Sequence, residues 1–365
     1  MKNTYTLWSI MIIILVSVLL LNGCGFKDID KRLFVTAIGV DLAKNNSKKY
    51  IISLKFSIPL KDKPSDFTIV SEEGNSIAEA VRIIKTKVEK EIDFSQAKVI
   101  VFSEDYAKQN MAPNILYWFS RRRDIQEIAW VAVGKPTALE VLKVRPKSEN
   151  LPSNAVYLSL GKEGSETPYV ISEFMFDMKK RFKERGLDPY LPIIQAKKEL
   201  FEINTVCLFN KKQVKLTLIP EETKMLNFLL KQEEKSSLKV KLGKQGFFID
   251  TQKVKVNYKI LAPMDKKPYI KVNVKVKGRI EEANYTVDNN HLTKYEKATE
   301  RKLNSSIKSL LVKIQKANVD PIGFGLRFRS RHFNNDDWEE WKRIYPTITF
   351  QVQTKVKIDD TGLIE

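Results

Sequence analysis

The sequence predicts an α+β fold, with mixed β-sheets flanked by helices in two to three domains. Strand-like runs occur in both halves of the chain, and those of the second half alternate apolar and polar residues, which is typical of half-buried strands. Segments with apolar residues every three to four positions, typical of amphipathic helices, lie between them without regular alternation. The 365 residues are also enough for more than one core. This irregular order disfavours a doubly wound α/β sheet.

Residues 1–23 are predicted to be a lipoprotein signal peptide that is removed from the mature chain. Lys2 supplies a positive charge, residues 7–21 form an apolar run, and Leu21-Asn22-Gly23-Cys24 ends it. An uncleaved anchor is the alternative, but this run is shorter than the roughly 20 residues that cross a bilayer. Cys24 is therefore the predicted site of lipid attachment. A diacylglyceryl group has two acyl chains, which is enough for stable anchoring to the outer face of the cell membrane.

Residues 24–198 are predicted to form an N-terminal α+β region, and a further division near residue 148 is left open. Strands are expected over residues 33–41, 50–58, 97–102 and 125–133. Helices are expected over residues 77–88, 113–119, 136–142 and 169–185. The clearest helix is the first, since Ile77, Val81, Ile84 and Val88 share one face.

Residues 203–365 are predicted to form a C-terminal α+β domain. A hairpin around residues 210–212 leads to a helix that begins at Pro220. Valines and lysines alternate between residues 238 and 280, and the last strand, 348–358, also alternates, which predicts valines in a core and lysines in water. A long helix between these strands has a predicted capping box, Thr293-Lys294-Tyr295-Glu296.

The segment Asp320-Pro321-Ile322-Gly323-Phe324-Gly325 is predicted to be a turn between the long helix and the final strand. Pro321 cannot continue a helix, and the two glycines permit positive φ angles. We expect a structural hinge here. Contact with a partner is a candidate role for Asp320, Pro321, Gly323, Phe324 and Gly325. A plain turn is the alternative, because turn chemistry alone explains each residue type.

The residue types predict a protein that is not an enzyme and that uses no metal or cofactor. The two histidines, His291 and His332, are far apart in the sequence and lie beside polar residues. Cys207 is the one cysteine besides Cys24, and its apolar neighbours predict burial rather than reactivity. No glycine-rich phosphate loop is found. No catalytic residue is therefore assigned.

The formal net charge of +19 favours a negatively charged neighbour. For a lipid-anchored protein this neighbour is an anionic membrane surface, where each basic side chain contributes about 1 kcal/mol. The alternative is a solvated surface that keeps the protein soluble. Nucleic acid is disfavoured as a partner, because the lysines alternate with valines rather than with exposed aromatic residues and because the chain has an export signal.

A series of motifs along the chain resembles the Ger(x)C family, the lipoprotein C subunits of spore germinant receptors. In order they are Leu21-Asn22-Gly23-Cys24; Ile29-Asp30 followed by Val35-Thr36-Ala37-Ile38-Gly39-Val40-Asp41; Phe94-Ser95-Gln96-Ala97-Lys98-Val99-Ile100-Val101; Gly186-Leu187-Asp188-Pro189-Tyr190-Leu191-Pro192-Ile193; Pro220-Glu221-Glu222-Thr223; Asp320-Pro321-Ile322-Gly323-Phe324-Gly325; and residues 352–362. Their order and spacing carry the resemblance. The chain departs from the family pattern at Gly25, where tryptophan is common, and at Ile219, where a hydroxyl cap is common.

The resemblance implies a lipid-anchored receptor subunit in nutrient-triggered germination. It implies a place on the outer surface of the spore inner membrane, beside an integral membrane A subunit and a transporter-like B subunit. A stand-alone solute-binding lipoprotein is the alternative, and it would show repeated βα units in two lobes, which the sequence lacks. The sequence does not identify the germinant.

Overall fold

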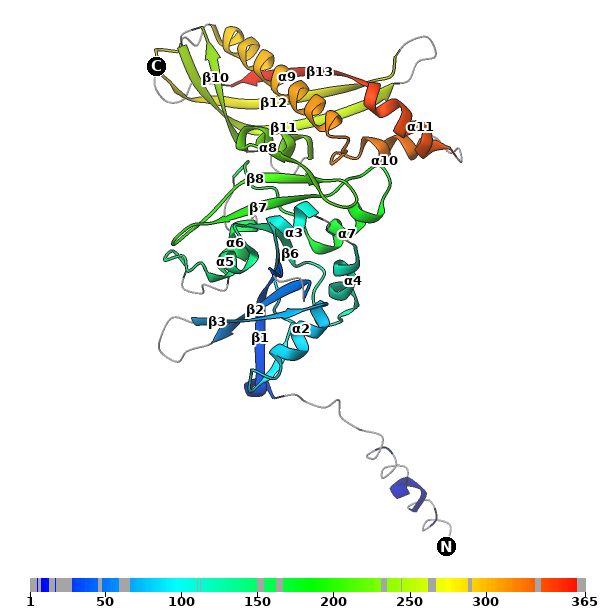
Figure 1. Ribbon diagram of the computed structural model, residues 1–365. Coiled ribbons are helices and arrows are strands. Elements are labelled where there is room, and N and C mark those ends of the chain that lie inside the picture. The colour runs from blue at the N-terminus through cyan, green and yellow to red at the C-terminus, as the bar shows by residue number, and fades with distance from the viewer. Residues whose placement is uncertain are drawn as a thin grey trace.

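The computed structural model describes residues 28–359, except 45–47, 59–65, 110, 112, 150–153, 162–166, 231–234, 244, 262–266, 288–290 and 332–335, together with residues 5, 8–12 and 17. Figure 1 shows strands β1–β3 at one end of the molecule, β10–β13 at the other, and β7 and β8 between them. None of the described helices is long and apolar enough to cross a membrane. The chain has the predicted α+β architecture, with mixed sheets and two domains.

The larger sheet is built from nine of the described strands and has the order β3-β2-β1-β5-β6-β7-β8-β9, with β4 beside β1. The strands are β1 (Arg32–Leu42), β2 (Tyr50–Ile58), β3 (Asp66–Gly74), β4 (Glu91–Asp93), β5 (Val99–Ser103), β6 (Trp130–Lys135), β7 (Tyr190–Ala196), β8 (Phe201–Phe209) and β9 (Val214–Leu218). Strands β1, β5, β6 and β7 are parallel neighbours, and the outer strands pair antiparallel. The sheet therefore continues from the N-terminal region into β8 and β9.

Helices cover both faces of this sheet. They are η1 (Ile29–Lys31), α2 (Ile77–Ile84), α3 (Glu104–Gln109), α4 (Pro113–Arg121), α5 (Ala138–Lys143), α6 (Ala155–Leu160) and α7 (Met175–Lys183). One core includes residues of α2, α3, α4 and α7, and a smaller core includes residues of α5 and α6. Because helices lie on both faces, the central strands are buried on both faces, as parallel strands usually are.

The C-terminal domain is a four-stranded sheet of the order β10-β11-β12-β13 with a long helix packed against it. Its elements are α8 (Pro220–Leu230), β10 (Ser236–Leu242), β11 (Gln245–Leu261), β12 (Tyr269–Ala283), α9 (Leu292–Lys316), α10 (Phe324–Arg329), α11 (Asp337–Ile344), η3 (Tyr345–Thr347) and β13 (Thr349–Ile358). Valines such as Val256 and Val274 are buried toward α9, and the intervening lysines are exposed. The predicted alternation is confirmed.

The capping box predicted at residues 293–296 is wrong. Helix α9 begins at Leu292 after His291, and no side-chain hydrogen bond caps it. Glu296 instead accepts the backbone N–H of Ile358 at 2.9 Å, and Glu300 accepts that of Val356 at 3.0 Å. The carboxylate of Glu296, which the sequence pattern placed in the capping box, thus binds strand β13 instead of the helix N-terminus.

The helix predicted over residues 169–185 is also wrong in its first part. It begins at Met175, because Phe174 lies in extended backbone that bridges to Trp130. The two rings stack with centroids 3.8 Å apart. Strand β6 accordingly begins at Trp130 rather than at residue 125. Strand β3 and helix α6 were not expected from the sequence.

Candidate functional site

Two motifs that lie far apart in the sequence meet where the two domains join. The first is the loop between α7 and β7, which contains Gly186 and Asp188, and the second is the turn between α9 and α10, which contains Asp320. The backbone N–H of Asp188 donates to the carbonyl oxygen of Asp320 at 2.8 Å. In return, the N–H of Asp320 donates to Oδ2 of Asp188 at 2.7 Å. We call these two segments, residues 186–188 and 320–325, the interdomain joint.

The carboxylate of Asp320 organises the second half of this joint. Its Oδ1 accepts the N–H groups of Gly323 at 2.8 Å and Phe324 at 3.1 Å, and its Oδ2 accepts that of Gly325 at 2.7 Å. Burial, reinforced by the neighbouring Asp188 carboxylate and opposed by these three donors, raises the pKa of Asp320 to about 7. The side chain therefore fixes the first turn of α10 from inside the protein.

The glycines of the joint serve two different purposes. Gly323 has a φ of 84° and Gly186 a φ of 79°, in the left-handed region that favours glycine. Gly325 lies inside α10 and does not have a positive φ, so the prediction that it uses one is wrong. A Cβ on Gly325 would lie 2.5 Å from Nε1 of Trp341 and 2.7 Å from Cα of Gly186. Gly325 is thus required by close packing between the two domains.

Arg181 of α7 connects the joint to the N-terminal core. Its guanidinium donates to the carbonyl oxygen of Pro321 at 2.9 Å and to that of Asp188 at 3.2 Å. It also pairs with the carboxylate of Glu173 at 2.7 Å, and the Glu173 side chain is only 3% exposed. Burial raises the pKa of Glu173, although the charge of Arg181 opposes the shift.

Lys211, from the β8–β9 turn, contacts the joint from a third element. Its Nζ lies 3.2 Å from Oδ1 of Asp188 and donates to the carbonyl oxygens of Arg181 and Leu187. Burial lowers the pKa of Lys211, and the Asp188 carboxylate opposes the shift. Cationic side chains therefore stand beside the two adjacent carboxylates of the joint.

The structure brings together all five residues that the sequence marked for possible partner contact. Asp320, Pro321, Gly323, Phe324 and Gly325 are buried, and the contacts of the turn include the loop at residues 186–188 of the same chain. Direct contact with another subunit stays a prediction.

The basic side chains Arg181 and Lys211 were missed, as was Glu173. Arg181 and Lys211 lie in basic or polar stretches that give no sign of burial. Glu173 lies between apolar residues, Ile171 on one side and Phe174 on the other, so its neighbours were a signal of burial that could have been used. The motif that starts at Gly186 was noticed only through the family resemblance.

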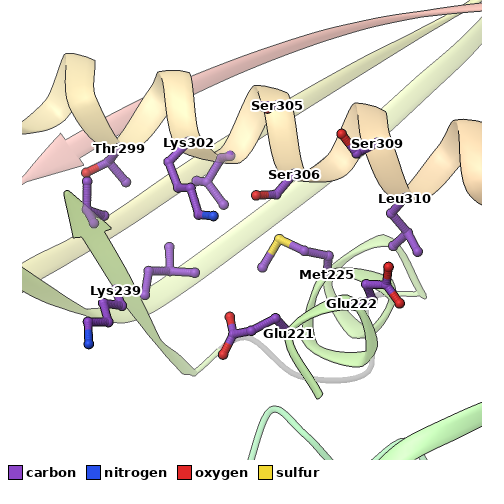
Figure 2. A pocket seen from close by; sticks show the side chains of 13 residues that line it. Glu221, Glu222, Met225, Lys239, Thr299, Lys302, Ser305, Ser306, Ser309 and Leu310 are labelled. Carbon is purple, nitrogen blue, oxygen red and sulfur yellow. The ribbon is translucent and has the colours of Figure 1, made fainter. Parts of the chain in front are cut away.

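A groove of about 290 Å³ lies between α8, β10 and α9 in the C-terminal domain. Figure 2 shows Lys302 and Ser306 of α9 facing Met225 and Glu221 of α8 across it. Its two carboxylates already have partners. Glu222 accepts Lys313 at 2.7 Å, and Glu221 pairs with Lys224 at 3.0 Å. The negative charges of the groove are therefore already neutralised by lysines of the same chain.

The residue types that the sequence raised for catalysis or metal binding are the cysteines and histidines. No group of three or more potential metal ligands occurs among the described residues. Cys207 is buried, its thiol donates to the carbonyl oxygen of Leu191 at 3.3 Å, and burial raises its pKa. His291 precedes α9 at the exposed surface, whereas His332 and Cys24 lie outside the described residues.

Comparisons with known proteins match nearly the whole chain. Residues 25–196 match the spore germination protein N-terminal domain, and residues 204–362 match the spore germination B3/GerAC-like C-terminal domain. The chain is 25% identical to spore germination protein KC of Bacillus subtilis (strain 168), over 96% of this chain and 95% of that protein. It is also 25% identical to spore germination protein GerQC of Bacillus cereus, over 81% of this chain and 83% of that protein.

The fold is similar to the crystal structure of the GerBC protein, with a TM-score of 0.58. The match covers 88% of this chain and 97% of that chain at 16% sequence identity, so it speaks for the fold alone. Both family domains are present in their expected order, and the motifs that meet at the joint lie one in each domain. The chain therefore belongs to the GerAC-like family of spore germination proteins, the family of germinant receptor C subunits.

Proposed function

We propose that this protein is the lipid-anchored C subunit of a germinant receptor, acting with integral membrane A and B subunits in nutrient-triggered germination. The observation that carries the proposal is the position of Cys24. The N-terminal family domain begins at residue 25, directly after this cysteine, and the signal-peptide pattern ends at it. The proposed anchor residue and the start of the family domain are thus adjacent in the sequence.

This arrangement supports a location on the outer face of the cell membrane, which in spores is the inner membrane. Four residues separate Cys24 from Ile29 of η1, so five Cα–Cα steps of about 3.5 Å place the folded body within about 18 Å of the lipid. Lys31 is exposed at this end of the molecule and can reach anionic headgroups. Each such contact contributes about 1 kcal/mol and supplements the acyl chains.

The proposed role is structural and regulatory rather than catalytic. The two domains are held together by hydrogen bonds between residues 186–188 and residues 320–326, which suits a rigid subunit that transmits a signal between partners. A stand-alone solute-binding lipoprotein remains the second candidate, and the groove in Figure 2 is the feature that favours it. That groove lies within the C-terminal domain and not between two lobes.

Mass spectrometry of the native N-terminal peptide tests the anchor. We expect acyl chains on Cys24 and no residues before it, and Cys24→Ala should leave the protein unprocessed or release it from the membrane. An unmodified Cys24 in the native protein would refute the anchoring. Co-purification from spore membranes tests the receptor role. A receptor subunit should be isolated together with A and B subunits, whereas a stand-alone solute-binding lipoprotein should be isolated without them.

A further inference from the structure

The exposed face of the C-terminal sheet presents a grid of lysines. Strands β11, β12 and β13 place them directly opposite one another in two adjacent rows. One row is Lys253, Lys277 and Lys357, and the other is Lys255, Lys275 and Lys355. All six side chains are exposed. We call these six residues the lysine grid.

Opposing lysines on neighbouring strands are unfavourable for the fold. Side chains directly opposite have Cβ atoms about 5 Å apart, and like charges at this distance are destabilising. Among the described residues, one carboxylate pairs with the grid: Asp359 lies 2.8 Å from Lys277. Solubility alone is served better by interspersed charges of both signs. The grid therefore concentrates positive charge beyond what a solvated sheet face requires.

A row of amide side chains continues the grid along the strands. Asn257, Asn273 and Gln353 are cross-strand neighbours next to the Lys255 row. Amide groups both donate and accept hydrogen bonds, so they can pair with peptide groups or carboxylates. The face thus combines a dense positive charge with groups that can bind a polypeptide.

We propose that the lysine grid is a docking surface for an acidic segment of a partner protein. The positive charge of the grid favours an anionic partner. The position of the grid on the molecule favours a protein over an anionic membrane as that partner. Figure 1 shows β11–β13 at the end of the molecule opposite β1, and the lipid on Cys24 must lie near the β1 end. This step rests on the proposed anchoring. The membrane that holds the lipid would therefore lie at the β1 end of the molecule, away from the lysine grid.

The expected contact is steered by charge and sensitive to salt. Lysines are uncommon at the centres of stable interfaces, but complementary charges accelerate encounter and fix orientation. Screening weakens exposed charge pairs strongly above about 0.1 M salt, where the Debye length is near 10 Å. The grid therefore suits a reversible contact and not a permanent one.

The test uses the full chain anchored in neutral phosphatidylcholine vesicles and titrated with a short fluorescent poly-L-glutamate. The variant Lys255→Gln/Lys275→Gln/Lys355→Gln removes one row, and Lys294→Gln/Lys297→Gln/Lys316→Gln removes the same charge from exposed positions on α9. We expect the row variant to raise the dissociation constant about tenfold and the α9 control less than about threefold. The row variant should melt no lower than the unmodified chain, because it relieves repulsion.

Equal weakening in the two variants would show that net charge alone binds the probe, and it would overturn the proposal. Unchanged binding by the row variant would overturn it as well. A second arm replaces poly-L-glutamate with vesicles that contain phosphatidylglycerol. If the row variant loses only vesicle binding, the grid is a membrane contact and the protein-docking proposal is wrong. Binding of the probe reports on the grid, whereas acylation of Cys24 is measured separately by mass spectrometry, so failure of this proposal can be told apart from failure of the proposed anchoring.

Discussion

Asp188 and Asp320 bind each other's backbone although 132 residues separate them in the sequence. Each donates its N–H to an oxygen of the other, the carbonyl oxygen of Asp320 in one case and the carboxylate of Asp188 in the other. This exchange resembles a pair of strand hydrogen bonds between two turns. It ties the end of α7 to the start of α10, and so it fixes one domain against the other.

Asp320→Asn should destabilise the protein while preserving the shape of the side chain. An amide has one accepting oxygen, so at least one of the three backbone N–H groups would face an NH₂ donor. We expect a loss of about 1–3 kcal/mol in the free energy of unfolding, measured by chemical denaturation. A loss of less than about 0.5 kcal/mol would show that Asp320 does not organise the turn.

The stability contribution of Asp320 should fall as the pH rises. Its pKa is raised from 3.8 to about 7, so between these values the folded protein binds more protons than the unfolded chain. The contribution is therefore fully present below about pH 4 and is lost as the pH passes through 7. The stability gap between the natural chain and Asp320→Asn should narrow over this range. A gap that widens with pH would contradict the raised pKa.

Gly325→Ala should be costly because of close packing and not because of backbone strain. The added methyl would overlap the indole of Trp341 and the backbone of Gly186. Overpacking of this kind costs about 1–3 kcal/mol, which thermal denaturation can measure. Gly246→Ala is the control, since the nearest atom to its added Cβ is 3.8 Å away and its φ is not positive. Equal stability of the two variants would refute the assigned role.

Arg181→Met should destabilise the protein strongly, because it leaves the buried Glu173 carboxylate without its cation. Removing one partner of a buried ion pair costs about 3–5 kcal/mol. Adding Glu173→Gln should recover part of this loss, since the second change removes the unpaired charge. A double-mutant cycle on the free energy of unfolding measures the coupling. Additive effects would show that the 2.7 Å contact contributes no coupling energy.

The thiol of Cys207 should react only when the protein unfolds. It is buried and its pKa is raised, so the reactive thiolate is scarce and inaccessible. With a colourimetric disulfide reagent we expect negligible labelling of the native protein and one thiol per chain in denaturant. Two thiols in denaturant would show that Cys24 is free. Rapid native labelling would contradict the burial of Cys207.

The long, strongly periodic elements could be predicted from the sequence, and the reason lies in their one-sided burial. The face of α9 that contains Leu303 and Ile307 packs against a single sheet, so its period survives in the sequence. Phe174 shows why the pattern fails elsewhere. It stands three residues after Ile171, at helical spacing, but its ring is used to stack on Trp130 from an extended segment.

The residues of the joint could be found in the sequence, but their pairing could not. Residues 320–325 have the composition of an ordinary turn, and local chemistry accounts for each residue, although Phe324 and Gly325 already belong to α10. The need for glycine at position 325 arises from Trp341 and Gly186, which the chain brings there only on folding. The salt bridge between Arg181 and Glu173 likewise could not be predicted from the sequence. The spacing of the two residues along the chain does not distinguish a buried ion pair from two exposed charges.

The contact of α9 with β13 has a consequence for how the protein can assemble. Strand β13 is at the edge of its sheet, where unpaired N–H groups commonly recruit a strand from another chain. The carboxylates of Glu296 and Glu300 already occupy the N–H groups of Ile358 and Val356. This half of the edge is closed to strand addition. A strand added at this half of the edge would have to displace both carboxylates, so another chain would meet it through side chains rather than through backbone hydrogen bonds.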